Sequence, residues 1–261
     1  MMRIGKRGIL LLVMVMVVGV LASACSQDAQ VETKKIIMGL DDTFAPMGFR
    51  DSSGQIVGFD VDLANEMAAR NGWELEFQPI DWSMKETELN AGNIDLIWNG
   101  YTITDARKEM VNFSNPYLAN AQVVVVLNDS SITTLEDLEG KSVATQAESS
   151  SLDAARAEAG FIESLKDGKI IEYATFNDVF NDLESKRTEA IIVDEVMARY
   201  YMNNKGEENY RVLEDNLGPE EFGIGVRKTD EDLLKEINDT LEAMKSDGKY
   251  DEIYEKWFSK N

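Results

Sequence analysis

Two separated segments of the chain carry side chains that suit opposite charges. The first, Asn99–Lys108, combines backbone N–H groups, threonine hydroxyls and Arg107 directly after an expected buried strand at 95–98. A planar guanidinium can grip both oxygens of a carboxylate, and neutral donors complete such a site. The second segment ends the apolar run 190–193 with Asp194, which could hold an ammonium group. Together the two segments predict a receptor for an α-amino acid.

Both charged residues also have an ordinary structural role open to them. Arg107 could be a surface residue of the helix expected to begin at Asp105. Asp194 could cap the helix expected to begin at Glu195, which is a common position for aspartate, and capping does not prevent ligand contact.

The composition excludes several kinds of site and partner. The chain has 261 residues with no histidine and one cysteine, so it holds no Ser-His-Asp triad, histidine metal site, internal disulfide or thiolate zinc site. Its 48 acidic and 26 basic side chains give a net charge of −22. Such a surface repels nucleic acid and keeps an extracellular protein soluble. We expect no metal, no cofactor and no nucleic-acid partner.

Residues 1–24 are expected to be a signal peptide rather than part of the fold. Basic residues precede a short apolar run at 9–18, and small residues lead to Cys25. This arrangement resembles a lipoprotein signal, with Cys25 as the lipidated first residue and 25–34 as a tether. One departure is that the usual leucine three residues before the cysteine is Ala22, while Leu21 stands one position earlier. Cleavage by an ordinary signal peptidase is the alternative.

Strand and helix patterns alternate along the rest of the chain. Expected helices include 60–71, 85–91 and 249–258, each bounded by a glycine or turn signal, and strands are expected at 36–38, 75–77 and 95–98. A second unit repeats this order from 122 onward. The alternation predicts an α/β fold with two doubly wound lobes, joined by two hinge strands, and a ligand cleft between them.

The expected lobe boundaries follow from this reading of the chain. The first lobe takes residues 35–120 and 222–261, and the second takes 121–221 with the hinge strands. Strands are expected at 210–213 and 222–226. The chain runs between them through Gly218–Glu221, of which Glu220–Glu221 is expected to be a solvated hinge loop. Asp41, Asn99 and Asp194 then fall at the carboxyl ends of strands, where ligands bind in such folds.

Six motifs occur in an order and spacing that resemble a known family. They are Gly58–Leu63, Gly100–Lys108, Phe113–Tyr117, Val193–Glu195, Phe222–Gly225 and Tyr254–Phe258. Over 35–258 the chain resembles the amino-acid-binding proteins of bacterial ABC importers, solute-binding protein family 3. The resemblance implies a binding protein with a two-lobed fold of the periplasmic-binding-protein type, and no catalytic residue.

The resemblance also implies roles for individual residues. Arg107 would hold the ligand α-carboxylate with the N–H and hydroxyl of Thr102, and the Gly100 carbonyl and Asp194 would hold the α-ammonium. In the same way, the following are expected to contact the rest of the ligand: Phe44 and Trp82 as an aromatic sandwich, Asp41 at the distal end of the side chain, and Gln146, Ser149 and Ser150 as donors from the second lobe.

Some of these assignments leave alternatives open. Phe44 and Trp82 could be core aromatics, and of the adjacent Asp41 and Asp42 only one is expected to face the cleft. Glu148 stands where the family usually has a glycine, whose freedom would permit a left-handed backbone near the ligand. Asp60 is interpreted as a helix cap without a part in binding.

The predicted function is an extracytoplasmic receptor, anchored to the membrane by lipid, that delivers a polar L-amino acid to the permease of an ABC importer. Asp41 fits an amide donor, as in glutamine, or a cationic end, as in arginine, lysine or histidine, and it disfavours glutamate. Of these ligands we favour arginine and glutamine. We expect a monomer that binds free amino acid. The alternative is an enzyme on the same scaffold, similar to cyclohexadienyl or arogenate dehydratases, in which Glu148 or Glu195 could supply the acid.

Overall fold

The computed structural model describes residues 33–259. The expected signal peptide, Cys25 and most of the tether lie outside the described residues. The described residues from Lys34 onward form one compact unit. Within the described part of the chain, no helix combines the length and the apolar character that crossing a membrane requires.

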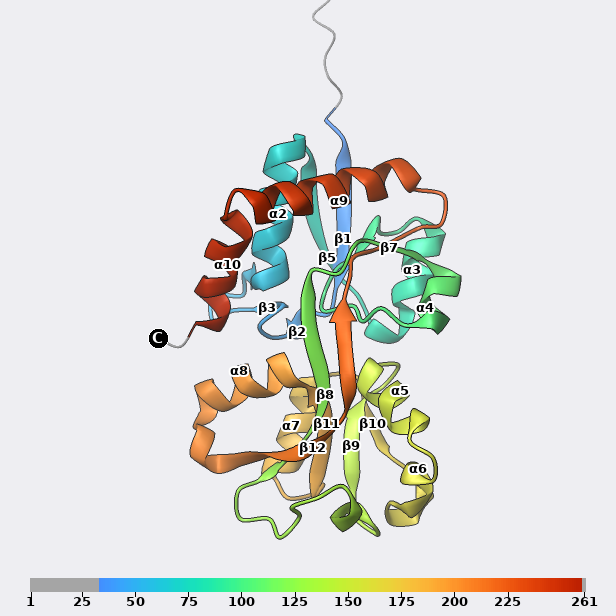
Figure 1. Ribbon diagram of the computed structural model, residues 1–261, viewed down its shortest axis with the longest axis vertical. Coiled ribbons are helices and arrows are strands. Elements are labelled where there is room, and N and C mark those ends of the chain that lie inside the picture. Colours follow the sequence, from blue (N-terminus) through green and yellow to red (C-terminus); the bar gives the residue numbers. More distant parts are fainter. Residues whose placement is uncertain (1–32, 260–261) are drawn as a thin grey trace, which may run out of the picture. The chain divides into compact units, whose positions relative to one another are not determined.

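The first lobe is built on a five-stranded sheet of order β5-β1-β6-β13-β7 (Figure 1). β5, β1 and β6 are parallel, while β13 is antiparallel to β6 and to β7. The strands are β1 (Lys35–Leu40), β5 (Glu74–Pro79), β6 (Leu96–Ile97), β7 (Asn112–Phe113) and β13 (Gly225–Val226). A small second sheet holds β2 (Thr43–Phe44), β3 (Gly48–Arg50) and β4 (Ile56–Val57).

Helices lie on both sides of this sheet, with α2 and α10 on one side and α3 and α4 on the other (Figure 1). The helices of the lobe are α2 (Phe59–Asn71), η1 (Trp82–Met84), α3 (Lys85–Ala91), α4 (Asp105–Met110), α9 (Glu231–Ser246) and α10 (Lys249–Phe258). The expected helices at 85–91 and 249–258 have these bounds. Gly72 and Gly92 end α2 and α3 in the left-handed conformation, which glycine adopts without a steric penalty.

The second lobe repeats this plan with a sheet of order β10-β9-β11-β8-β12. Its strands are β8 (Leu118–Leu127), β9 (Val143–Gln146), β10 (Ile171–Tyr173), β11 (Ala190–Asp194) and β12 (Tyr210–Phe222). β10, β9 and β11 are parallel, and β8 is antiparallel to β11 and β12. The helices are η2 (Glu136–Leu138), α5 (Ser150–Ala157), α6 (Phe161–Ser164), η3 (Lys166–Gly168), α7 (Phe176–Glu184), α8 (Glu195–Lys205) and η4 (Glu207–Asn209).

The apolar runs of β8 and β11 are buried on both faces. Val123, Val125 and Ile191 belong to one core cluster, whereas Val124 and Ile192 belong to another. Successive side chains of a strand point to opposite faces, so an unbroken apolar run fits a strand covered by helices on both sides. Both lobes are therefore helix–sheet–helix layers, as the α/β reading of the sequence predicts.

Two long strands, β8 and β12, run between the lobes (Figure 1). They pair antiparallel from Leu118 opposite Phe222 to Leu127 opposite Tyr210, with irregularities on either side of Asn216. The solvated hinge loop expected at Glu220–Glu221 is wrong, because these residues continue β12. Pro219 is tolerated there because β12 is an edge strand, where a missing N–H costs little. The separate strand expected at 222–226 is reduced to Gly225–Val226.

Candidate functional site

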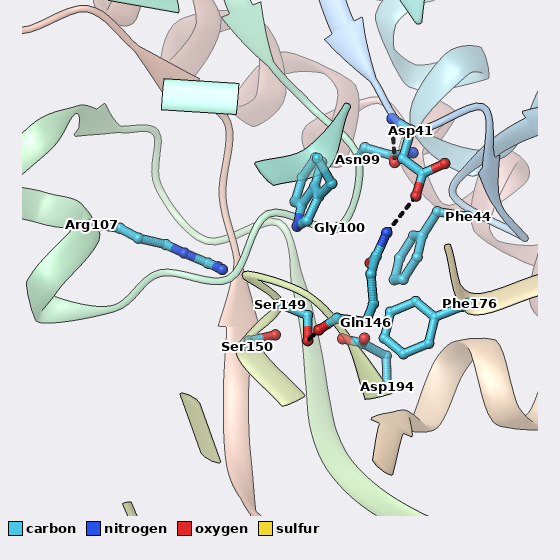
Figure 2. Close-up of a pocket in the computed structure, with 11 residues that line it drawn as sticks. Asp41, Phe44, Asn99, Gly100, Arg107, Gln146, Ser149, Ser150, Phe176 and Asp194 are labelled. Atoms are coloured by element: carbon cyan, nitrogen blue, oxygen red, sulfur yellow. Dashed lines mark hydrogen bonds between the residues drawn. The ribbon is translucent and has the colours of Figure 1, made fainter. Parts of the chain in front are cut away.

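The carboxyl ends of parallel strands from both lobes meet at one cavity. Asp41 follows β1, and Asn99 and Gly100 follow β6, while Gln146 and Asp194 end β9 and β11. The cavity is narrow: the volume open to water is about 10 Å³, room for roughly one water molecule. It is lined by Asp41, Phe44, Trp82, Asn99, Gly100, Arg107, Gln146, Ser149, Ser150, Phe176 and Asp194 (Figure 2).

Of the residues expected to bind ligand, Thr102 alone does not line this cavity. It lies beside it, because its hydroxyl donates to Ser150 Oγ at 2.9 Å across the two lobes. Asn99 and Phe176 line the cavity without having been assigned to the site. Phe176 begins a helix directly after a strand, and its ring lies 5.7 Å from that of Phe44. Ligand contact by any of these residues stays a prediction.

Arg107 is held rigidly at one end of the cavity. It lies on α4, whose first turn is capped by Thr104, with the Arg107 N–H donating to Thr104 Oγ1 at 3.2 Å. The side chain is 4% exposed. Its guanidinium packs 4.8 Å from the Tyr101 ring centre and donates from Nη1 to the Thr102 carbonyl at 3.0 Å. A buried arginine with fixed orientation is suited to bind a carboxylate and does not fit the surface-residue alternative.

The loop before α5 approaches Arg107 from the second lobe. Glu148 has a φ of 54°, so this position keeps the left-handed conformation that a glycine would favour. The Glu148 carbonyl accepts from Arg107 Nη2 at 3.4 Å and from Lys85 Nζ at 3.1 Å. Lys85 is buried, and burial together with the charge of Arg107 lowers the pKa of its ammonium group. Two cations from the first lobe thus bind the same carbonyl.

Asp194, the residue expected to hold the ligand ammonium, ends the strand β11 of the second lobe. It stands at the N-cap position of α8 but makes no capping bond with its side chain; instead, Asn120 Oδ1 accepts from the Val196 N–H at 3.2 Å. Asp194, 2% exposed, lines the cavity, and its Oδ1 accepts from the side-chain amides of Asn120 and Gln122. Burial and the nearby carboxylate of Glu220 raise the pKa of Asp194 well above its ordinary value.

Asp41 faces the cavity and Asp42 does not line it. Asp41 Oδ1 accepts from the N–H and hydroxyl of Thr43 at 2.9 and 2.6 Å, and Oδ2 accepts from Gln146 Nε2 at 2.7 Å (Figure 2). Asp42 pairs with Arg50. Burial raises the pKa of Asp41. The Gln146 bond joins the two lobes, so the cavity is closed over this end.

Gly100 is fixed from behind by Asp60. Its φ is 59°, and a side-chain carbon there would lie 2.7 Å from the Phe44 ring. The Gly100 N–H donates to Asp60 Oδ2 at 2.8 Å, and the Tyr117 hydroxyl donates to the same oxygen at 2.9 Å. The expectation that Asp60 is a helix cap is wrong: Gly58 takes that position, and Asp60 is fully buried, which raises its pKa to about 7.

Among residues 33–259, no three histidine, cysteine, aspartate or glutamate side chains gather in a group that could hold a metal ion. The acidic side chains of the cavity are Asp41 and Asp194. Glu148 and Glu195, the residues considered as an acid for a dehydratase, do not line it.

The fold and the two charged ends of the cavity are those of a two-lobed solute receptor. Residues 36–260 match the family described as bacterial extracellular solute-binding proteins, family 3, and the chain belongs to that family.

Individual relatives cover nearly the whole chain. The arginine-binding extracellular protein ArtP of Bacillus subtilis (strain 168) is 30% identical over 257 residues, covering 97% of this chain and 98% of ArtP. An ABC uptake transporter substrate-binding protein from Streptococcus pneumoniae, solved with bound histidine, is 41% identical with a TM-score of 0.84. The match covers 87% of this chain and 93% of that protein. An ancestral arginine-binding protein bound to glutamine is 38% identical with a TM-score of 0.79. The match covers 87% of this chain and 98% of that protein.

Proposed function

We propose that this protein is an extracytoplasmic receptor that binds a polar L-amino acid, with arginine or glutamine favoured, and delivers it to the permease of an ABC importer. The observation that carries the proposal is the cavity itself, which has a buried guanidinium, Arg107, and a buried carboxylate, Asp194, on its wall. An α-amino acid carries both complementary charges. The relatives are named for, or were solved with, arginine, histidine or glutamine, which supports the same class of ligand.

Each part of the amino acid has a proposed partner. Arg107 and Thr102 hold the α-carboxylate, and the Gly100 carbonyl and Asp194 hold the α-ammonium. Gln146, Ser149 and Ser150 add contacts from the second lobe. Phe44 and Trp82 pack on the ligand side chain, to which the structure adds Phe176, and Asp41 receives its distal donor group.

A thermal-shift screen of all proteinogenic amino acids, with ornithine and cystine added, tests the proposal. A ligand that binds only the folded protein raises its melting temperature in proportion to the logarithm of its concentration over Kd. Arginine or glutamine is expected to give the largest shift. A screen in which no amino acid raises the melting temperature would contradict the proposed function.

We propose a binding protein rather than an enzyme, because neither carboxylate considered for the dehydratase reaction lines the cavity. A receptor returns its ligand unchanged. Incubation with arogenate or prephenate, followed by analysis of the recovered compound, is expected to show no loss of water. Formation of phenylalanine or phenylpyruvate would establish the enzyme instead.

We further propose that the mature chain begins at Cys25, carries lipid on that residue and works as a monomer. Residues 35–120 and 222–261 form one lobe and 121–221 the other. Cys25→Ser is expected to move the protein from the membrane fraction to the medium or periplasm, because two acyl chains hold a protein firmly whereas none leaves it free. Membrane fractionation checks this, with Ser26→Ala as the control. Finding the unaltered protein in the soluble fraction would contradict lipid anchoring.

A further inference from the structure

A second carboxylate stands beside the one proposed to hold the ligand ammonium. Glu220 lies on the strand β12, opposite Asn120 of β8. Two amide groups of β8 each reach both acids. Asn120 Nδ2 donates to Asp194 Oδ1 at 2.8 Å and to Glu220 Oε1 at 2.6 Å. Gln122 Nε2 lies 3.0 Å and 2.8 Å from the same two oxygens.

The two acids lie close enough together that Asn120 Nδ2 and Gln122 Nε2 each reach an oxygen of both. An ionised carboxylate has no hydrogen to donate, so two ionised carboxylates this close repel each other and cannot satisfy each other. Two carboxylates that share a buried site cannot both ionise at ordinary cost, and one of them retains its proton. Asp194 is 2% exposed, so solvent does little to relieve the repulsion.

The donors around the pair do not remove this need for a proton. Gln122 Nε2 has two hydrogens but three acceptors within 3.1 Å, the third being Ser150 Oγ. Gln122 Oε1 is occupied by the hydroxyl of Ser151. No lysine or arginine forms an ion pair with Asp194 or Glu220 in the described part of the chain.

We propose that Glu220 is a functional residue of the ammonium site: Asp194 and Glu220 together hold one proton when the cavity is empty, and the α-ammonium of an entering amino acid takes its place. This inference rests on the proposed function, since it requires an amino acid as ligand. The proton leaves to solvent or buffer, and no covalent bond of the ligand changes. When the α-ammonium of one amino acid binds to this pair, up to one proton is therefore released.

The direction of the pH effect follows from this exchange. At low pH the empty pair is protonated, and binding must expel the proton, so affinity is weak. Affinity then rises with pH until the empty pair is already ionised, above which it becomes constant. Linkage sets the limit at about tenfold per pH unit for one released proton. The α-carboxylate and α-ammonium of the ligand keep their charges between about pH 4 and 7.

The pH effect of the pair must be distinguished from that of other charged or titratable groups nearby. Asn120 and Gln122 of β8 and Ser150 of α5 are neutral, and Glu195 of α8 pairs with Arg199 at 3.0 Å. Within the cavity, Arg107 and Asp41 are the other charged residues, and Asp60 lies behind Gly100. All remain in a Glu220 variant. The chain has no histidine, so histidine titration does not contribute.

Isothermal titration calorimetry with L-arginine and L-glutamine tests the proposal. Runs in buffers of different ionisation enthalpy count the protons released, and runs across about pH 5 to 7 give the affinity profile. The unaltered protein is expected to release a substantial fraction of one proton and to bind roughly threefold to tenfold more tightly per pH unit on the acidic side. Glu220→Gln keeps the size of the side chain and removes its charge. On binding, this variant is expected to release fewer protons, and its affinity is expected to change by less than about twofold per pH unit.

Glu221→Gln is the matched control, because Glu221 is the next residue of β12 but its side chain is exposed. It is expected to follow the unaltered protein. A pH profile and proton count that Glu220→Gln leaves unchanged would overturn the proposal while leaving amino-acid binding intact. Absence of proton release in the unaltered protein would overturn it too. If Glu220→Gln does not fold, Glu220→Asp provides a second test, with reduced coupling expected. Failure of every amino acid to bind would count against the proposed function instead.

Discussion

Replacing Arg107 with alanine is expected to weaken amino-acid binding by roughly thirty-fold to several thousand-fold. The guanidinium is 4% exposed and fixed by the Thr102 carbonyl and the Tyr101 ring. Removing one partner of a buried, hydrogen-bonded charge pair costs about 2–5 kcal/mol, because the other charge is left without a partner. Each ~1.4 kcal/mol is a factor of ten in Kd. Titration calorimetry on the purified variant measures the loss.

Two further variants separate loss of the contact from general damage. Arg107→Lys keeps a positive charge but cannot bind both carboxylate oxygens in a plane, so an intermediate loss is expected. Lys108→Ala removes the neighbouring exposed cation, which pairs with Asp105, and is expected to bind normally. Near-normal affinity of Arg107→Ala would remove Arg107 from the site.

A ligand that lacks the carboxylate gives an independent check of the same contact. Agmatine is arginine without its α-carboxylate, so it is expected to bind the unaltered protein weakly. If Arg107 acts on that group, Arg107→Ala weakens arginine much more than it weakens agmatine. Equal losses for both compounds would show that Arg107 supports the fold of the site and does not contact the carboxylate, since a double-mutant cycle then gives no coupling.

Local sequence signals were sufficient for the elements that carry the site. Helices α3 and α10 have the expected bounds because a glycine marks one end of each, Gly92 after α3 and Gly248 before α10. Asp41, Asn99 and Asp194 could be placed at one edge because each closes or follows an expected strand, whereas Gln146 was assigned only through the resemblance to the family. The left-handed conformation at Glu148 could be expected only from the family's usual glycine, since glutamate itself gives no such signal.

What the sequence did not predict depends on pairing between distant segments. Gly218-Pro219 is typical of a loop, yet the register with β8 extends β12 through it. That register alone places Glu220 beside Asn120 and brings both to Asp194, 26 residues earlier in the chain than Glu220. One signal was present, because Gln122 is a polar residue at the start of the buried run Val123–Val126. A buried amide requires partners, which points to a polar site at that position.

Replacing Asp41 with asparagine is expected to change which amino acid binds best. Asp41 is 6% exposed, and its Oδ2 is held by the amide of Gln146, a contact that a ligand donor can replace or share. A buried carboxylate must be paired, which a guanidinium or carboxamide achieves and a second carboxylate does not. Arginine or glutamine is therefore expected to bind the unaltered protein best. Glutamate and aspartate are expected to bind at least about a hundred-fold more weakly. Each factor of ten in Kd corresponds to ~1.4 kcal/mol of binding free energy.

The variant distinguishes charge from hydrogen bonding at the same position. Asparagine keeps an acceptor but removes the charge, so Asp41→Asn is expected to weaken arginine much more than glutamine. Citrulline, the neutral isostere of arginine, is expected to respond as glutamine does. Asp42→Asn is the matched control, since Asp42 pairs with Arg50 and does not line the cavity. Competition titrations of these ligands on the three proteins decide the point. If acidic or purely aliphatic amino acids bind best, Asp41 does not receive the ligand side chain.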